Sequence, residues 1–114
     1  MTGRSERVLL PWQKVRVSGP SMVPTLRHGD VVVVRYGAAI RPGDVVIATF
    51  RSLPDRTVIK RAERPIDGGW WLRSDNSSAV GDSEQHGIAD VSARVVLRLR
   101  GWRASTRMRR PRQT

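Results

Sequence analysis

The chain has 114 residues, which fits a single domain of ordinary size. It contains no cysteine, which excludes a disulfide scaffold, a thiol nucleophile and a cysteine-built metal site, and its two histidines argue against a histidine-rich one. The formal net charge is +11, and residues 91–114 contribute eight arginines and no acid.

Residues 1–13 are expected to be an extension that precedes the folded domain. Residues 1–8 lack the apolar stretch of a secretory signal, and no apolar run in the chain approaches the roughly 20 residues of a membrane-spanning helix. Short β-branched or alternating segments then follow one another, separated by turns that contain Gly, Pro or Asp. We predict strands at residues 14–18, 31–36, 45–51, 57–63, 70–73 and 91–100, with a polar loop at Ser74–Ala89.

This pattern predicts a mainly β domain, a small barrel or sandwich with few or no helices. The ordered domain is expected to span residues 14–102. Residues 103–114 form an arginine-rich tail that we expect to be disordered. Such a tail indicates an acidic partner, nucleic acid or an anionic membrane surface, and a merely solvated tail is the alternative.

Lys60 is the first candidate for chemistry. Of the 21 basic residues, 19 are arginine, so a retained lysine suggests a task that arginine cannot perform. On an alternating strand, Lys60 shares a face with Val58 and Ala62, the apolar side. Burial there lowers the pKa of an amine and makes it a general base near neutral pH. The alternative is a lysine at the strand edge with its ammonium group in water.

Ser21 is the second candidate, because it follows the sharp turn that Gly19–Pro20 predicts. A serine on a rigid turn can present its hydroxyl, and nearby free backbone N–H groups can receive an oxyanion. The alternative is that Ser21 caps a short helical turn. Ser21 and Lys60 together suggest a nucleophile and its base. A Ser–His–Asp triad through His86 remains formally possible, although a polar loop predicts an exposed His86.

Five segments occur in the order found in the type I signal peptidase family, which the chain resembles from about residue 15 to residue 96. The nucleophile segment is similar to Ser18–Leu26 here, and the base segment to Ile59–Arg61. The other three resemble family segments at Gly29–Val34, Arg41–Val46, and the run that contains Asp75–Asn76, Asp82–Ser83 and Gly87.

The resemblance implies a β-rich catalytic fold and a Ser/Lys protease that needs no metal or cofactor. By motif position, Ser21 would attack the scissile carbonyl, and Lys60 would take its proton and later protonate the leaving amine. The backbone N–H of Ser21 would contribute to the oxyanion hole. The remaining supporting residues implied by the resemblance are Ser18, Met22, Asp82 and Ser83. Family substrates carry small residues before the cleaved bond.

The sequence departs from the family pattern at several points. Gly19 stands where some members place an oxyanion-hole serine, and Glu84 replaces an arginine of the last segment. Val80 stands where many members have a serine that hydrogen-bonds the lysine, so packing or another hydroxyl would have to hold Lys60. There is also no membrane anchor in the sequence.

The short, anchor-free chain resembles the subclass of nickel-type superoxide dismutase maturation proteases, which remove an N-terminal leader from the dismutase precursor. We therefore expect a cytoplasmic endopeptidase whose partner is that precursor. The first alternative is a signal peptidase acting on secreted preproteins, peripheral at the inner face of the membrane through weak contacts of the basic tail with anionic lipid.

The second alternative is a non-catalytic basic β-barrel that binds nucleic acid or an acidic protein. Trp70 and Trp71 would point to opposite faces of a strand, and the basic residues gather in the tail rather than around them, which argues against nucleic acid. An autoproteolytic repressor would need a DNA-binding domain, for which the chain leaves no room.

Overall fold

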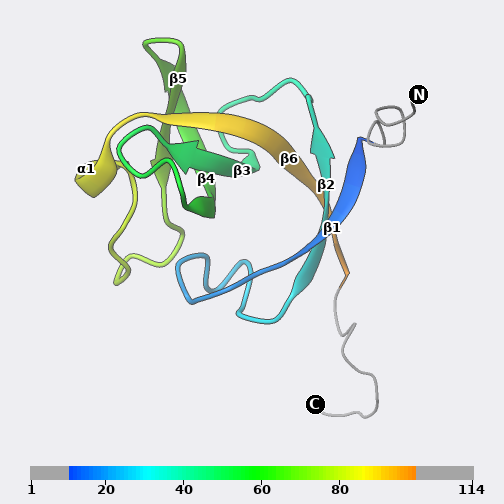
Figure 1. The fold of residues 1–114 in the computed structure, drawn as a ribbon. Coiled ribbons are helices and arrows are strands. Elements are labelled where there is room, and N and C mark those ends of the chain that lie inside the picture. Colours follow the sequence, from blue (N-terminus) through cyan, green and yellow to red (C-terminus); the bar gives the residue numbers. More distant parts are fainter. Residues whose placement is uncertain (1–10, 100–114) are drawn as a thin grey trace.

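The computed structural model describes residues 11–99 and confirms a mainly β fold with one short helix (Figure 1). The β-branched and alternating segments of the sequence form its strands. The elements in chain order are β1 (Trp12–Arg16), β2 (Val31–Tyr36), β3 (Val45–Phe50), β4 (Thr57–Ile66), β5 (Gly69–Arg73), α1 (Ser83–His86) and β6 (Ala89–Leu99).

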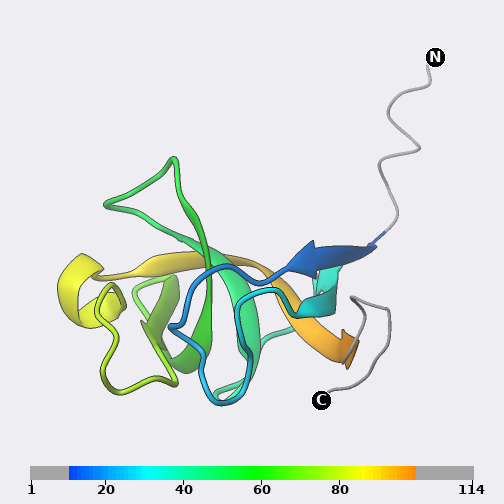
Figure 2. The same cartoon turned by 90° about the horizontal axis from the view of Figure 1, so that it is seen from below.

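All six strands pair antiparallel in the order β1-β2-β6-β3-β4-β5. A further pairing of Trp70 in β5 with Ala89 in β6 closes β3, β4, β5 and β6 into a small barrel. β6 therefore belongs to two units, since its first half lies in this barrel and its second half pairs with β2. Figures 1 and 2 show β6 running from α1 across the molecule to the β1–β2 ribbon.

Two clusters of buried side chains fill the interior, and β3 separates them. Ile47 points into the first cluster, which lies under the ribbon and includes Met22 and Leu26. Its neighbours Val46 and Ala48 point to the other face of the strand, into a cluster inside the barrel with Phe50 at its centre. The barrel core therefore packs against β4 through Ala62, and the ribbon core packs against the segment that carries Ser21 through Met22.

β3, β5 and β6 lie within two residues of the predicted bounds, and three further differences have a structural reason. The first strand is Trp12–Arg16, because Trp12 and Gln13 extend the ladder along β2 while the chain bends away before Gly19. β4 continues to Ile66 because Asp67 and Gly68 both adopt positive φ and form a tight two-residue hairpin turn. The predicted loop after β5 contains a four-residue helix, α1, which Asp82 caps.

Within residues 11–99, no helix is long and apolar enough to cross a membrane. Most of the predicted extension 1–13, the boundary at residue 102 and the tail 103–114 lie outside the described residues, so these assignments stay predictions.

Candidate active site

The turn that carries Ser21, residues 18–26, is held by buried side chains and by a hydrogen bond to its backbone. We call it the nucleophile turn, after the family segment that it resembles. Met22 and Leu26 bury their side chains in the ribbon core, with 0% and 3% of their surface exposed. Gly19 enters the turn at a φ of +85°, which favours glycine, and its N–H donates to Nδ1 of His28 over 3.0 Å. Ser21 therefore lies on a turn whose backbone is held by contacts on either side of it.

Lys60 is buried in the wall of the barrel, and only 5% of its surface is exposed. As the alternation predicts, it shares the inner face of β4 with Val58 and Ala62, which pack in the barrel core. Its Nζ donates a hydrogen bond to Oγ of Ser74 over 3.0 Å. Desolvation by burial lowers the pKa of Lys60, and the nearby negative charge of Asp82 opposes this only in part.

Ser21 and Lys60 line one cavity of about 500 Å³. Its wall comes from the end of β1, the nucleophile turn, Ile47 of β3 and the start of β4. Within residues 11–99, the Ser21 hydroxyl makes no hydrogen bond to Lys60, and the backbone N–H of Ser21 donates none either. Catalytic hydrogen bonds often tighten only when substrate is present, so the absence of a bond between Ser21 and Lys60 is compatible with a catalytic pair.

The segment Ser74–Asn76, directly after β5, connects the two candidate residues. Ser74 accepts the hydrogen bond from Lys60, as described above. Two residues later, the backbone N–H of Asn76 donates to the carbonyl of Ser21 over 2.9 Å, and its side-chain amide donates to the carbonyl of Pro20 over 3.0 Å. One short segment thus sets the position of the nucleophile turn relative to β4.

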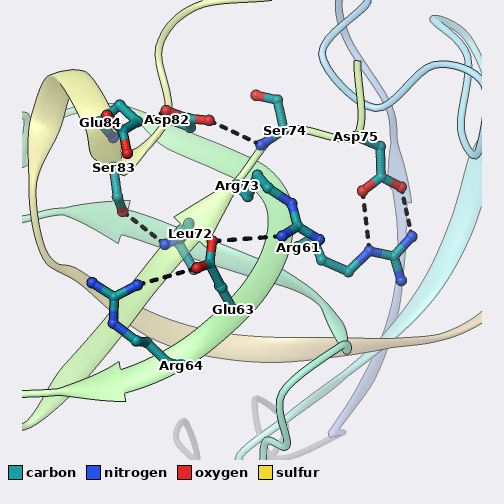
Figure 3. Close-up of polar contacts among 10 residues, drawn as sticks. All are labelled: Arg61, Glu63, Arg64, Leu72, Arg73, Ser74, Asp75, Asp82, Ser83 and Glu84. Atoms are coloured by element: carbon teal, nitrogen blue, oxygen red, sulfur yellow. Dashed lines mark hydrogen bonds and ion pairs between the residues drawn. The ribbon is translucent and has the colours of Figure 1, made fainter. Parts of the chain in front are cut away.

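Asp75, between Ser74 and Asn76, connects the nucleophile turn to β4 through hydrogen bonds of its carboxylate. It accepts hydrogen bonds from Nε and Nη2 of Arg61 at 3.1 and 2.5 Å (Figure 3) and from the hydroxyl of Thr25 at 2.6 Å. Arg61 is the neighbour of Lys60 on β4, and Thr25 lies on the nucleophile turn. Burial raises the pKa of Asp75, but the hydrogen bonds from Arg61 and Thr25 outweigh it and lower that pKa overall.

Asp82 and Ser83 hold α1 against β5 (Figure 3). One carboxylate oxygen of Asp82 accepts from the N–H of Glu84 at 3.0 Å, and the other from the N–H of Ser74 at 3.2 Å. The hydroxyl of Ser83 is 1% exposed and accepts from the N–H of Leu72 over 2.7 Å. The partners of Asp82 are thus backbone amides, one of which belongs to the residue that contacts Lys60.

Comparison with known proteins bears on what this arrangement is. A profile of the family described as Peptidase S24-like matches residues 13–96, most of the chain and all of the site. The chain belongs to the Peptidase S24-like family. This supports the signal-peptidase-like resemblance and a peptidase of the serine type at that coarser level.

The chain is also similar to the mitochondrial inner membrane protease subunit 1 of Mus musculus, with 32% identity over 97 residues. That alignment covers 64% of this chain and 58% of the mouse protein, so the chain spans little more than half the length of this relative. Neither comparison shows the dismutase-maturation subclass.

Within this Peptidase S24-like domain, the predicted supporting residues lie near Ser21 and Lys60 or near residues that contact them. Ser18 lines the cavity with Ser21, and Met22 is fully buried directly beneath the nucleophile turn. Val80 is 76% exposed and lines a smaller cavity of about 130 Å³ on another side of Lys60. The hydroxyl that meets Lys60 comes from Ser74 instead, six residues earlier in the chain.

Other sequence interpretations find less support in this S24-like domain. His86 lines the smaller cavity and packs its ring 5.1 Å from that of Phe50, whereas Ser21 lines the larger cavity. Trp70 packs against the barrel core, and Trp71 lies 5.1 Å from the guanidinium of Arg64. The two tryptophans therefore do not form one stacking platform.

Proposed function

We propose that this protein is a serine endopeptidase in which Ser21 is the nucleophile and Lys60 the general base. The observation that carries the proposal is the lysine, a buried amine with a lowered pKa that lines the same cavity as a serine on a rigid turn. A lowered pKa makes the neutral amine more accessible, and only the neutral amine can accept a proton from a hydroxyl. The Peptidase S24-like family supports the same assignment.

The reaction then proceeds in two halves. As Oγ of Ser21 bonds to the scissile carbonyl carbon, its proton passes to Nζ of Lys60. When the C–N bond breaks, Nζ returns that proton to the leaving amine, and an ester to Ser21 remains. Water attacks the ester and gives a proton to Nζ, which returns it to Ser21 as the acid leaves. The backbone N–H of Ser21, without a partner in the described residues, supports the oxyanion.

Two strand edges beside the cavity favour an extended substrate. β1 is the outermost strand of the sheet, and its last residues, Val15 and Arg16, line the cavity. β4 pairs with β5 only from Arg61 onward, so residues 57–60 are paired on one side alone among the described strands. A peptide can add to such edges through backbone hydrogen bonds. Val15, Ile47 and Ile59 favour small apolar substrate side chains.

The substrate class that we propose is a precursor protein from which an N-terminal leader is removed. The nickel-type superoxide dismutase precursor is the first candidate, on the resemblance noted in the sequence. A preprotein presented at a membrane is the second, and the observation that favours it is the similarity to a protease subunit named for the mitochondrial inner membrane.

The test is intact-mass analysis of the dismutase precursor after incubation with the protein. Ser21→Ala and Lys60→Arg should abolish cleavage while circular dichroism shows an unchanged fold, because alanine has no hydroxyl and an arginine side chain stays protonated and cannot accept a proton. Lys14→Arg, at the other lysine of the chain, is the matched control and should cleave normally. Cleavage by Lys60→Arg would exclude the dyad. If the wild-type protein cleaves a membrane-presented preprotein but not the dismutase precursor, the dyad assignment stands and the second candidate is the substrate.

A further inference from the structure

The cavity that holds Ser21 and Lys60 has two further cationic side chains in its wall. Arg16 comes from the end of β1 and Arg56 from the residue before β4, and both residues are exposed. None of the described residues that line this cavity is an aspartate or a glutamate. The entrance to the candidate active site is therefore positively charged.

No neighbouring carboxylate neutralises these two arginines within the described part of the chain. Asp55 is adjacent to Arg56 in sequence, yet it does not line the cavity and forms no ion pair with Arg56. Arg16 donates only to the neutral carbonyl of Gly29, over 3.4 Å. Arg61 on β4 differs from these two arginines, because Asp75 binds it in a 2.5 Å ion pair.

The spacing along β4 places Arg56 at a defined distance from the reacting groups. Thr57 precedes Lys60 by three residues on β4, or roughly 10 Å at about 3.3 Å per residue, and Arg56 is the next residue before it, so the backbones of Arg56 and Lys60 are roughly 10–13 Å apart. An extended peptide beside β4 advances at the same rate. If its scissile bond lies at Lys60, a side chain about four residues away lies beside Arg56.

We propose that Arg16 and Arg56 select substrates that carry an acidic residue three to five positions from the cleaved bond. This inference rests on the proposed peptidase function and adds a substrate class to it. A guanidinium pairs with a carboxylate through two parallel hydrogen bonds, which fixes position as well as charge. Since both arginines are exposed, salt should weaken the selection.

The test uses a chymotryptic peptide library from a bacterial lysate, which keeps internal acidic and basic residues, with cleaved sites identified by mass spectrometry. Wild type should cleave sites enriched five- to tenfold in Asp or Glu at one position three to five residues from the cut. Arg16→Glu/Arg56→Glu should replace that preference with one for Lys or Arg, and Arg16→Gln/Arg56→Gln should abolish it. Arg41→Glu/Arg94→Glu has the same charge change away from the cavity and should behave like wild type. An unchanged profile in the cavity variants overturns the inference and leaves the peptidase function intact.

A binding measurement separates the failure of this inference from the failure of the peptidase function. Fluorescence anisotropy would compare two labelled twelve-residue Ala/Ser peptides, one with four Glu and one with four Gln, on the Ser21→Ala protein. The Glu peptide should bind at least fivefold tighter, and adding Arg16→Gln/Arg56→Gln should remove the difference. Equal binding of the two peptides, or a difference that survives these substitutions, overturns the inference even if wild type cleaves no peptide.

Discussion

At the scale of single residues, the central feature is the side-chain amine of Lys60, which is buried and forms no ion pair with a carboxylate in the described residues. A charged ammonium is costly in such a place unless it is paired, so burial lowers the pKa of Lys60 and shifts its equilibrium toward the neutral form. Its hydrogen-bond partner, Ser74, is a neutral hydroxyl that does not compensate a positive charge as a carboxylate would. Protonation of this one group should therefore control activity.

The pH dependence of the reaction follows from that shift. Only the neutral amine can accept the Ser21 proton, so kcat/KM should rise with pH through the pKa of Lys60 and then level off. Because burial lowers this pKa, the midpoint should lie below the ordinary lysine value of about 10.4. Steady-state rates on a peptide substrate between pH 5 and 10 would measure it. Activity that is highest at acid pH and falls as pH rises would contradict a lysine base.

Ser74 is expected to act as a positioning residue, through Lys60 and not on the substrate. Ser74→Ala removes the acceptor of the Nζ hydrogen bond, and we expect kcat to fall by about 10- to 100-fold with little change in KM, because the base is no longer held in line. Ser74→Thr keeps the hydroxyl and should restore most of the rate. If both variants lose the same activity, the role of Ser74 is packing and not hydrogen bonding.

The sequence led to Lys60 through two observable signals, the scarcity of lysine and the alternation of β4, and the structure confirms the burial that they implied. Ser74 was beyond such reasoning, since it opened a polar loop with several other hydroxyls. Its contact with Lys60 depends on the register of β5 against β4 and on the bond from its N–H to Asp82, which no local pattern encodes. Family spacing pointed to position 80 instead, where an exposed valine stands.

At the scale of elements, the site depends on the connection between the nucleophile turn and β4. The Thr25–Asp75–Arg61 network spans them, and the Asp75 side chain is only 11% exposed. Residues 74–76 are thus the physical link between two segments that lie some forty residues apart in sequence. Sequence reasoning predicted the strands on either side of this link, but the link itself exists only once the chain is folded.

Asp75→Asn should destabilise the fold by about 1–3 kcal/mol, because a partly buried charged hydrogen bond is lost. Glu63→Gln is the matched control, since it breaks ion pairs to Arg64 and Arg73 whose side chains are about half exposed, and it should cost at most about 1 kcal/mol. Urea unfolding of both variants at pH 7 measures the difference. The Asp75 contribution should vanish as pH falls through its lowered pKa, because only the ionised carboxylate binds Arg61 in this way. Equal costs for the two variants would mean that the network does not link the elements.

At the scale of the whole molecule, closure of the barrel depends on one glycine. A Cβ built on Gly69 would lie 2.5 Å from the carbonyl oxygen of Ala89 and 2.7 Å from Cγ2 of Ile88, at the place where β5 meets β6. A methyl group there has to push the two strands apart, because the closest atom belongs to the backbone. Neither the hairpin sequence nor its alternation predicts this constraint, which arises from a contact between distant strands.

Gly69→Ala should therefore lower the free energy of unfolding by about 1–3 kcal/mol and weaken the packing of Trp70 beside it. Gly37→Asn serves as control, since a Cβ at Gly37 meets nothing within 4 Å and asparagine tolerates its φ of +74°. Thermal unfolding followed by tryptophan fluorescence would show whether the first variant melts earlier than the second. Wild-type melting of Gly69→Ala would mean that β5 and β6 separate at little cost.

The position of β6 in the sheet has a consequence for when the molecule becomes active. Among residues 11–99 it is the last strand, yet it pairs with β2, β3 and β5 and is the only strand there that joins ribbon and barrel. Residues 74–76 can contact both the Ser21 turn and β4 before β6 is made, but the ribbon and the barrel share no strand until residues 89–99 have been added. If the proposed function holds, we expect proteolytic competence to begin only after β6 has left the ribosome.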